Sequence, residues 1–278
     1  MTLKFSLIGS GAVRPNPGRA GPAQVVRLDD ELLLFDCGPS SVRALAAAGF
    51  PPQDVAALFI THLHFDHVAD FPYLVLVGWN NGRSGALDVV GPPGTAEFAA
   101  DSVTRAFKID IDTRLSHGKD PAGMRTAVSE IREPGQAAVG RGWTVAAIGH
   151  EHAGMANLAY LFEGGGGKIA IIGDAVPSED LVAFCAGADL LACECSGTRD
   201  FLDRFPWGAW HMTPREVAAL ARRAGVGRVV LKHFVMEDID GDREAAERMA
   251  REVRSGFDGE VIAGYDGLAI DVAASSRA

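Results

Sequence analysis

Residues 61–67, with the sequence Thr-His-Leu-His-Phe-Asp-His, constrain the fold of this chain more than any other segment. The five residues before them, 56–60, are all apolar. Such a short apolar run that ends abruptly in polar residues is typical of a buried strand. A spacing of two residues places the first two imidazoles on the same side of the strand's end. The candidate metal ligands of this segment are His62, His64, Asp66 and His67.

Other candidate site residues follow apolar segments in the same way: the ligand candidates Asp174 after 168–172 and His233 after 228–231, and the candidate catalytic residue Glu194 after 188–193. Strands from the beginning and the end of the chain must therefore bring their ends to one edge. Two sheets packed face to face, with helices outside, would achieve this. We also expect a hairpin over 24–35 and helices over 41–48, 96–107 and 243–255.

Bulk properties limit the classes of protein to consider. The chain has 278 residues, 47% of them hydrophobic, which suits a globular fold that we expect to be a single domain over residues 1–278. Four cysteines without a C-x-x-C motif favour a reduced, cytoplasmic protein. No apolar run approaches the roughly 20 residues that a membrane-spanning helix needs. The net charge of −10, without a long basic run, is unfavourable for holding a nucleic-acid backbone.

The pattern H-x-H-x-D-H after a hydrophobic strand resembles the metallo-β-lactamase superfamily. Two later segments resemble its branch of ribonuclease Z, phosphodiesterases and arylsulfatases. Residues 193–196, Cys-Glu-Cys-Ser, stand where that branch has His-Glu-Ala-Thr, and residues 211–213 give its H-x-T motif before an Ala-rich helix. The resemblance implies an α/β fold, the four-layer αββα sandwich, which binds metal ions between its two sheets.

The resemblance also implies a ligand set for two metal ions. Two histidines compete for one place in it. Counting from the strand that starts at Trp143 favours His152, whereas counting back from 158–162 favours His150. We prefer His152, and His150 remains an alternative metal or substrate contact. The first ion would be held by His62, His64 and His152, the second by Asp66, His67 and His233, with Asp174 bridging. Imidazole and carboxylate ligands suit two Zn²⁺ ions, and also Mn²⁺ or iron.

The implied activity is hydrolysis of a small phosphodiester, sulfate ester or similar ester by a metal-bridging hydroxide. Asp66 would orient the nucleophile, and His211 would act as general acid paired with Glu194. Asp36 would support a metal-binding histidine through a hydrogen bond. One alternative is hydrolysis of a lactone or thioester on the same metals, which needs no separate acid. A second is a redox or metal-sensing protein that binds iron.

We expect a small-molecule ester as substrate and do not expect a nucleic acid. Ribonuclease Z carries a flexible arm between its third-motif histidine and the bridging aspartate, whereas residues 153–173 leave room here for one hairpin. The aromatic segment 201–210 would suit a partly apolar substrate, the core, or a contact between the two copies of a homodimer. Arg14 and Arg19, in a Gly- and Pro-rich loop, are candidate substrate contacts.

Overall fold

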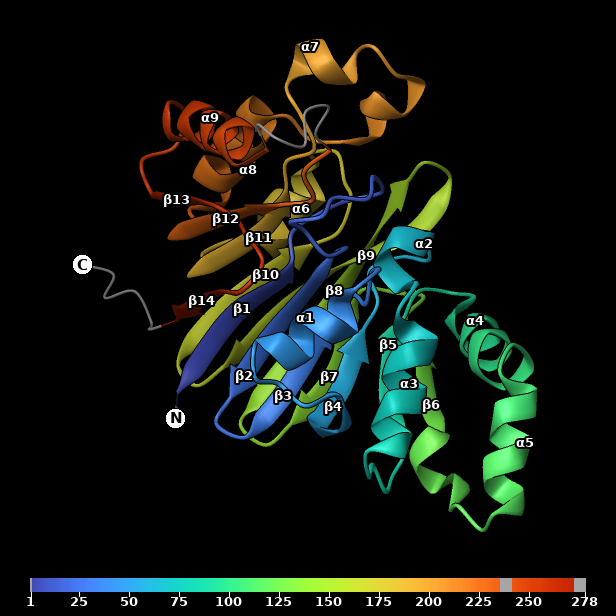
Figure 1. Cartoon of the computed structure of the whole chain (residues 1–278). Coiled ribbons are helices and arrows are strands. Elements are labelled where there is room, and N and C mark those ends of the chain that lie inside the picture. The colour runs from blue at the N-terminus through green and yellow to red at the C-terminus, as the bar shows by residue number, and fades with distance from the viewer. Residues whose placement is uncertain (1, 236–241, 273–278) are drawn as a thin grey trace.

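The computed structural model describes residues 2–235 and 242–272. Two seven-stranded sheets pack face to face, with helices on their outer sides (Figure 1). The first sheet has the order β14-β1-β2-β3-β4-β5-β6. Its strands are β1 (Leu3–Gly9), β2 (Ala23–Leu28), β3 (Glu31–Phe35), β4 (Val55–Phe59), β5 (Leu87–Gly91), β6 (Thr126–Glu130) and β14 (Leu268–Asp271).

The second sheet has the order β13-β12-β11-β10-β9-β8-β7. Its strands are β7 (Gly135–Gly140), β8 (Trp143–His152), β9 (Met155–Gly164), β10 (Gly167–Ile172), β11 (Leu190–Glu194), β12 (Arg228–Lys232) and β13 (Glu260–Ala263). The expected αββα sandwich is confirmed.

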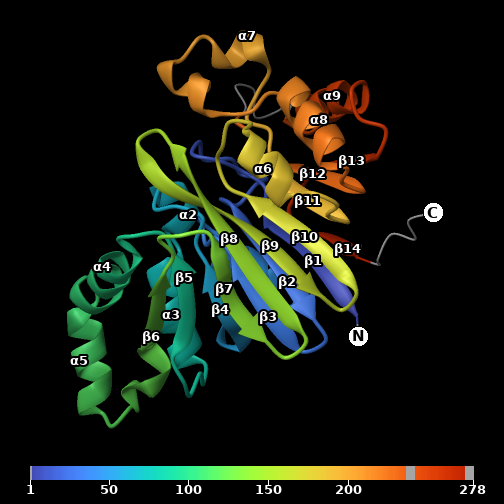
Figure 2. The ribbon, with the colours of Figure 1, turned by 180° about the vertical axis from the view of Figure 1, so that it is seen from behind.

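Helices cover both outer faces (Figures 1 and 2). On the first sheet lie α1 (Ser41–Ala47) and α3 (Phe71–Asn80), whose apolar side chains share one buried cluster with those of the strands. On the second sheet lie α6 (Glu179–Phe184), α8 (Pro214–Ala224) and α9 (Asp242–Arg254). The remaining helices are α2 (Phe65–Val68), α4 (Thr95–Ala99), α5 (Lys108–Ser116) and α7 (Arg199–Leu202).

The direction of the strands explains why the candidate ligands meet. In the second sheet β10, β11, β12 and β13 are parallel, and β8 runs the same way because both β8 and β10 are antiparallel to β9. In the first sheet β3, β4 and β5 are parallel. The carboxyl ends of parallel strands lie at one edge of a sheet, which is where α/β folds bind ligands.

A buried aromatic group ties the two sheets together beneath that edge. The rings of Phe35 and Phe59 stack with their centroids 4.8 Å apart, and Tyr160 of the opposite sheet meets both edge-on. The Tyr160 hydroxyl donates a hydrogen bond to the Ile60 carbonyl oxygen over 2.7 Å. Because Ile60 directly precedes the histidine motif, this bond fixes the position of the motif relative to the second sheet.

One expectation about secondary structure was wrong in detail, and one strand was not expected. The helix expected over 96–107 ends as α4 at Ala99, continues as a π-helical stretch over Ala100–Arg105, and is followed by α5. Strand β7 was missed, because its sequence, Gly-Gln-Ala-Ala-Val-Gly, has few large apolar side chains and no alternation. No helix in the described ranges is long and apolar enough to cross a membrane.

Candidate metal centre

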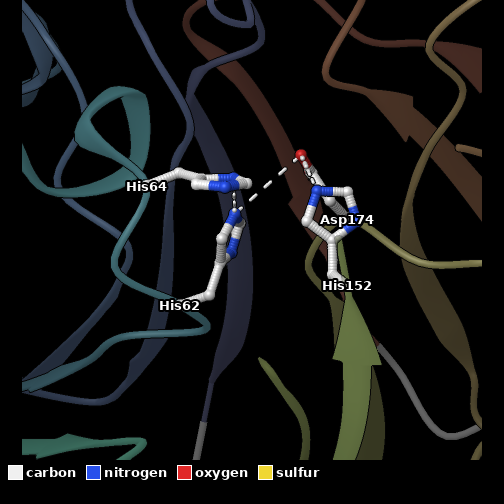
Figure 3. Close-up of side chains that lie close together, drawn as sticks. All are labelled: His62, His64, His152 and Asp174. Carbon is white, nitrogen blue, oxygen red and sulfur yellow. Dashed lines mark hydrogen bonds and ion pairs between the residues drawn. The ribbon is translucent and has the colours of Figure 1, made fainter. Parts of the chain in front are cut away.

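Four strand ends supply the side chains of the centre, and the first group comes from both sheets (Figure 3). His62 and His64 follow β4, His152 ends β8, and Asp174 follows β10. The nitrogen atoms His62 Nε2 and His64 Nδ1 are 2.9 Å apart and point at the same spot. Asp174 Oδ2 lies 3.6 Å from His152 Nε2 and 4.0 Å from His62 Nε2. One ligand atom from each of these four residues fits within 4.8 Å of the others, as a metal site requires.

A second group lies on the other side of Asp174. Asp66, His67 and His233 bring one ligand atom each within 4.8 Å of one another. Asp174 Oδ1 is 3.4 Å from His67 Nε2 and 3.2 Å from His233 Nε2. Asp66 Oδ2 is 3.5 Å from His233 Nε2. The two oxygen atoms of Asp174 thus face two different groups of imidazoles, which is the arrangement of a carboxylate shared by two metal ions.

Hydrogen bonds fix the orientation of several of these rings. His67 Nδ1 donates to Asp36 Oδ2 over 2.9 Å, and the backbone N–H of Thr61 donates to Asp36 Oδ1 over 2.8 Å. The Thr61 hydroxyl lies 3.0 Å from His62 Nδ1. The Ser196 hydroxyl lies 3.1 Å from His233 Nδ1. In each ring a partner on Nδ1 turns Nε2 towards the centre, and such partners set the tautomer that binds a metal.

Protonation follows from burial and from the charges nearby. Burial lowers the pKa of His62, His64 and His152, which favours the neutral imidazole that a metal ion needs. Burial also opposes a charge on His67, but the carboxylates of Asp174 and Asp36 outweigh it and raise the pKa of His67 to about 10. The two carboxylates therefore favour a positive charge beside His67, and a bound metal cation would supply it.

The polar atoms at the centre fit metal ions. His67 Nε2, His233 Nε2 and Asp174 Oδ1 are buried and make no hydrogen bond with any residue in the described ranges. Buried polar atoms normally have a hydrogen-bond partner. Three buried atoms without one, gathered around one point, therefore indicate a site for a bound ligand. The set of imidazole and carboxylate groups without a thiolate suits zinc, manganese or iron.

His211 and Glu194 form a hydrogen-bonded pair beside the centre. His211 Nδ1 donates to Glu194 Oε2 over 3.0 Å, and the Ser196 hydroxyl donates to the same oxygen. Burial disfavours the imidazolium, but Glu194 and Asp174 outweigh burial and raise the pKa of His211 to about 9. The ring edge that carries Nδ1 is 3.9 Å from Asp174 Oδ2 and is already bound to Glu194, so the pair suits proton donation better than metal binding.

The structure separates His150 from His152. The pocket at the metal centre has a volume of about 390 Å³, and His152 and Ala153 line it together with His64, Asp66, Asp174 and His211. His150 lines a different cavity with Arg132, Asn157 and Pro93. Both histidines belong to β8, His152 as its last residue, and only His152 lines the pocket at the metal centre.

The two candidate arginines have different surroundings. Arg19 is buried in an ion pair with Asp242, and it also donates to the Ser10 hydroxyl and to the Gly264 carbonyl oxygen. It holds the loop in place and lines no part of the pocket. Arg14 lies over the Phe205 ring, 6.0 Å from its centroid, close to the pocket mouth.

Sequence reasoning missed the roles of Thr61 and Ser196. Each hydroxyl lies beside the Nδ1 atom of a candidate ligand and also donates to a buried carboxylate, Asp36 or Glu194. Their position directly after a buried strand was the available signal, since residues there lie at the site edge. A serine at position 196 can make these contacts as the threonine of the related motif would.

Comparison with known proteins decides the family. The profile described as "Beta-lactamase superfamily domain" matches residues 32–234. The chain belongs to the metallo-β-lactamase superfamily. Among its curated relatives, the protein named ribonuclease Z from Mycobacterium bovis (strain BCG / Pasteur 1173P2) is 30% identical over 274 residues, 95% of this chain and 96% of the relative. Ribonuclease Z from Mycobacterium sp. (strain KMS) is 32% identical over 271 residues, 92% of this chain and 94% of the relative.

Solved structures agree with this fold. Human tRNase Z, short form, has a TM-score of 0.76 at 24% identity, covering 97% of this chain and 99% of that one. The metallo-β-lactamase fold protein YhfI from Bacillus subtilis has a TM-score of 0.75 at 21% identity, with the same coverage. The expected superfamily and branch are confirmed: this member is a metal-dependent hydrolase that acts on ester bonds, in a fold whose members bind a dinuclear metal site.

The expectation that a nucleic acid is not a partner was wrong, because the relatives that match this superfamily member over nearly its whole length are ribonucleases by name. The argument from the missing arm fails, since 274 aligned positions that cover 95% of this chain and 96% of the relative leave little room for an added arm in either. The argument from net charge also fails, because binding of a nucleic acid depends on the charges near the binding surface and not on the total charge of the chain. Arg14 and Arg204 both contact Phe205 near the pocket mouth of this acidic chain.

Proposed function

We propose that this superfamily member is a two-zinc phosphodiesterase that hydrolyses RNA, with Asp174 between the two ions. The observation that carries the proposal is the position of Asp174, whose two oxygen atoms face separate groups of histidines. The ribonuclease names of relatives at 30–32% identity support RNA as the substrate.

The proposed ligands fall on either side of Asp174: His62, His64 and His152 for one ion, and Asp66, His67 and His233 for the other. Zinc ions held there would lower the pKa of a water molecule and neutralise the negative charge that develops on the phosphate.

The residues around the ions have separate tasks in this proposal. Burial opposes the charged form of Asp66, but His233 and His67 outweigh burial and hold the pKa of that carboxyl below its usual value. Asp66 is therefore an anion that can accept a hydrogen bond from the attacking water and orient it. Asp36, Thr61 and Ser196 keep the imidazoles turned towards the ions.

His211 protonates the leaving oxygen. Glu194 holds Nδ1, so Nε2 is the nitrogen that can donate a proton into the pocket that the ring lines. The attacking water first gives up one proton to solvent; as the hydroxide oxygen bonds to phosphorus, the bond from phosphorus to the ribose oxygen breaks, and the proton from His211 passes to that ribose oxygen. A ribose alkoxide is a poor leaving group, so this proton matters for RNA.

The test is cleavage of end-labelled RNA by zinc-loaded protein, with single-stranded RNA and transfer RNA precursors in the panel. We expect cleavage by the wild type, and loss of cleavage after chelation or in Asp174→Ala. Hydrolysis of bis(p-nitrophenyl) phosphate is followed in parallel. A protein that holds its metals and cleaves this diester but no RNA would contradict the proposed substrate.

A further inference from the structure

Three aromatic side chains lie at the mouth of the pocket at the metal centre, and the proposed reaction assigns them no role. Phe65, Trp207 and Trp210, called here the mouth aromatics, line the pocket together with the candidate ligands. Phe65 is 64% exposed and Trp210 is 39% exposed. Large apolar rings exposed together beside polar groups commonly mark a binding site.

One of the mouth aromatics, Trp207, contacts the ring of the proposed general acid. Trp207 meets His211 edge-on with the centroids 5.6 Å apart. On its other side Trp207 stacks on Phe205, with the centroids 4.8 Å apart and the planes at 14°. Phe205 also meets Phe201 at 5.3 Å. A flat group bound against the mouth aromatics would therefore lie next to the group that protonates the leaving oxygen.

Two arginine side chains lie against Phe201 and Phe205. The guanidinium carbon of Arg204 is 4.9 Å from the Phe201 centroid and 5.8 Å from that of Phe205, and the guanidinium of Arg14 approaches Phe205 from the Gly- and Pro-rich loop. Arg14 and Arg204 thus bring two cations to this part of an acidic chain. Aromatic rings combined with arginines are the surface on which proteins bind single-stranded nucleic acid, because rings stack on bases and cations meet phosphates.

We infer that the mouth aromatics form a subsite that stacks the nucleobase next to the cleaved phosphate. The inference rests on the proposed function, because the metal centre anchors the phosphate. The pocket volume of about 390 Å³ leaves space for one base beside the metal centre. Stacking reads the flat face of a base and not its edge, so the subsite accepts every base and distinguishes a nucleotide from a sugar phosphate.

The test compares two ligands that share a phosphate and a ribose and differ in the base. Binding of adenosine 5′-monophosphate and of ribose 5-phosphate to the zinc-loaded full-length protein is measured by isothermal titration calorimetry. We expect the nucleotide to bind about 5- to 100-fold more tightly, as the stacking of one base would give. Equal affinities, or binding of neither ligand, would overturn the inference.

Variants assign the preference to the rings. Trp210→Ala and Phe65→Ala should each reduce the ratio of the two affinities, whereas Trp210→Phe should keep most of it. The matched control is Tyr73→Ala, which removes a 56% exposed aromatic ring on α3 outside the pocket lining. Zinc content and thermal unfolding of each variant show whether the fold is kept. A loss in Tyr73→Ala equal to that in Trp210→Ala would also overturn the inference.

Cleavage of RNA by the wild type separates this inference from the proposed function. Cleavage without a preference for the nucleotide contradicts the stacking subsite alone. A preference for the nucleotide without cleavage of RNA contradicts the proposed reaction and leaves the subsite in place.

Discussion

Replacing Asp36 by asparagine isolates the support that this carboxylate gives to the metal centre. Asp36 is fully buried and accepts hydrogen bonds from His67 Nδ1, from the Thr61 N–H and from the Thr61 hydroxyl. Its backbone is left-handed, with φ at 58°, a conformation that asparagine also tolerates. Asp36→Asn therefore keeps the shape and the backbone, but it removes the charge and one acceptor oxygen.

The expected loss is in metal affinity. Without the carboxylate His67 keeps neither its orientation nor the basicity of its Nε2, and the loss of such a partner typically weakens metal binding by about 10- to 100-fold. This corresponds to about 1.4 to 2.8 kcal/mol. The assay is competition for zinc with a coloured chelator.

Asp70→Asn is the matched control for this assay. The Asp70 carboxylate also accepts a hydrogen bond from a backbone N–H, that of Val42, but it lies outside the metal centre. We expect this variant to bind zinc as the wild type does. Equal zinc affinity in Asp36→Asn and Asp70→Asn would refute the role given to Asp36.

Four further predictions concern the acid, the ligands, the loop and the metals. His211→Ala should slow cleavage of RNA by about 10²- to 10⁴-fold and slow release of p-nitrophenolate far less, because only the poor leaving group needs the proton; an equal effect on both substrates, measured as initial rates, would contradict the role of His211 as the acid, and a variant with unchanged activity would favour the carboxylic-ester alternative. His152→Ala should lose metal by elemental analysis, whereas His150→Ala should keep metal and activity, and the reverse result would exchange their roles. Arg19→Met should lower the free energy of unfolding by about 3 to 5 kcal/mol, because it removes the guanidinium that pairs with the buried Asp242 carboxylate, which keeps a hydrogen bond from the Asn16 amide, and denaturant unfolding with an unchanged midpoint would contradict this. Chelation should abolish hydrolysis and added zinc should restore it, and rates that persist without metal would rule out the metal centre as the catalyst.

The candidate ligands could be located in the sequence because they follow buried strands, whereas their division between two metal ions came from the resemblance to the superfamily. An apolar run shows where a strand ends, and the parallel order of the strands brings those ends together. The resemblance to the superfamily predicted that Asp36 supports a metal-binding histidine and that Glu194 pairs with His211, and the structure places Asp36 beside His67 and Glu194 beside His211.

Other features depend on three-dimensional contacts that no local pattern contains. Counting from the two neighbouring strands gave His150 and His152 as competing candidates, and only the structure shows that they line different cavities. Arg19 looked like a substrate contact because its loop precedes the site, whereas its partner Asp242 lies over two hundred residues away. The total charge of the chain likewise concealed the two arginines gathered near the pocket mouth, and this led to the wrong expectation about nucleic acid.

The most direct test of the central claim is the metal content of the purified full-length protein, measured by elemental analysis beside an accurate protein concentration. If Asp174 is shared by two ions, the wild type should hold about two zinc ions per chain. Asp174→Ala should lose at least one of them, since the two groups of histidines would no longer share a ligand. A wild type that binds at most one ion after loading with zinc, or an Asp174→Ala variant that keeps two, would contradict the account.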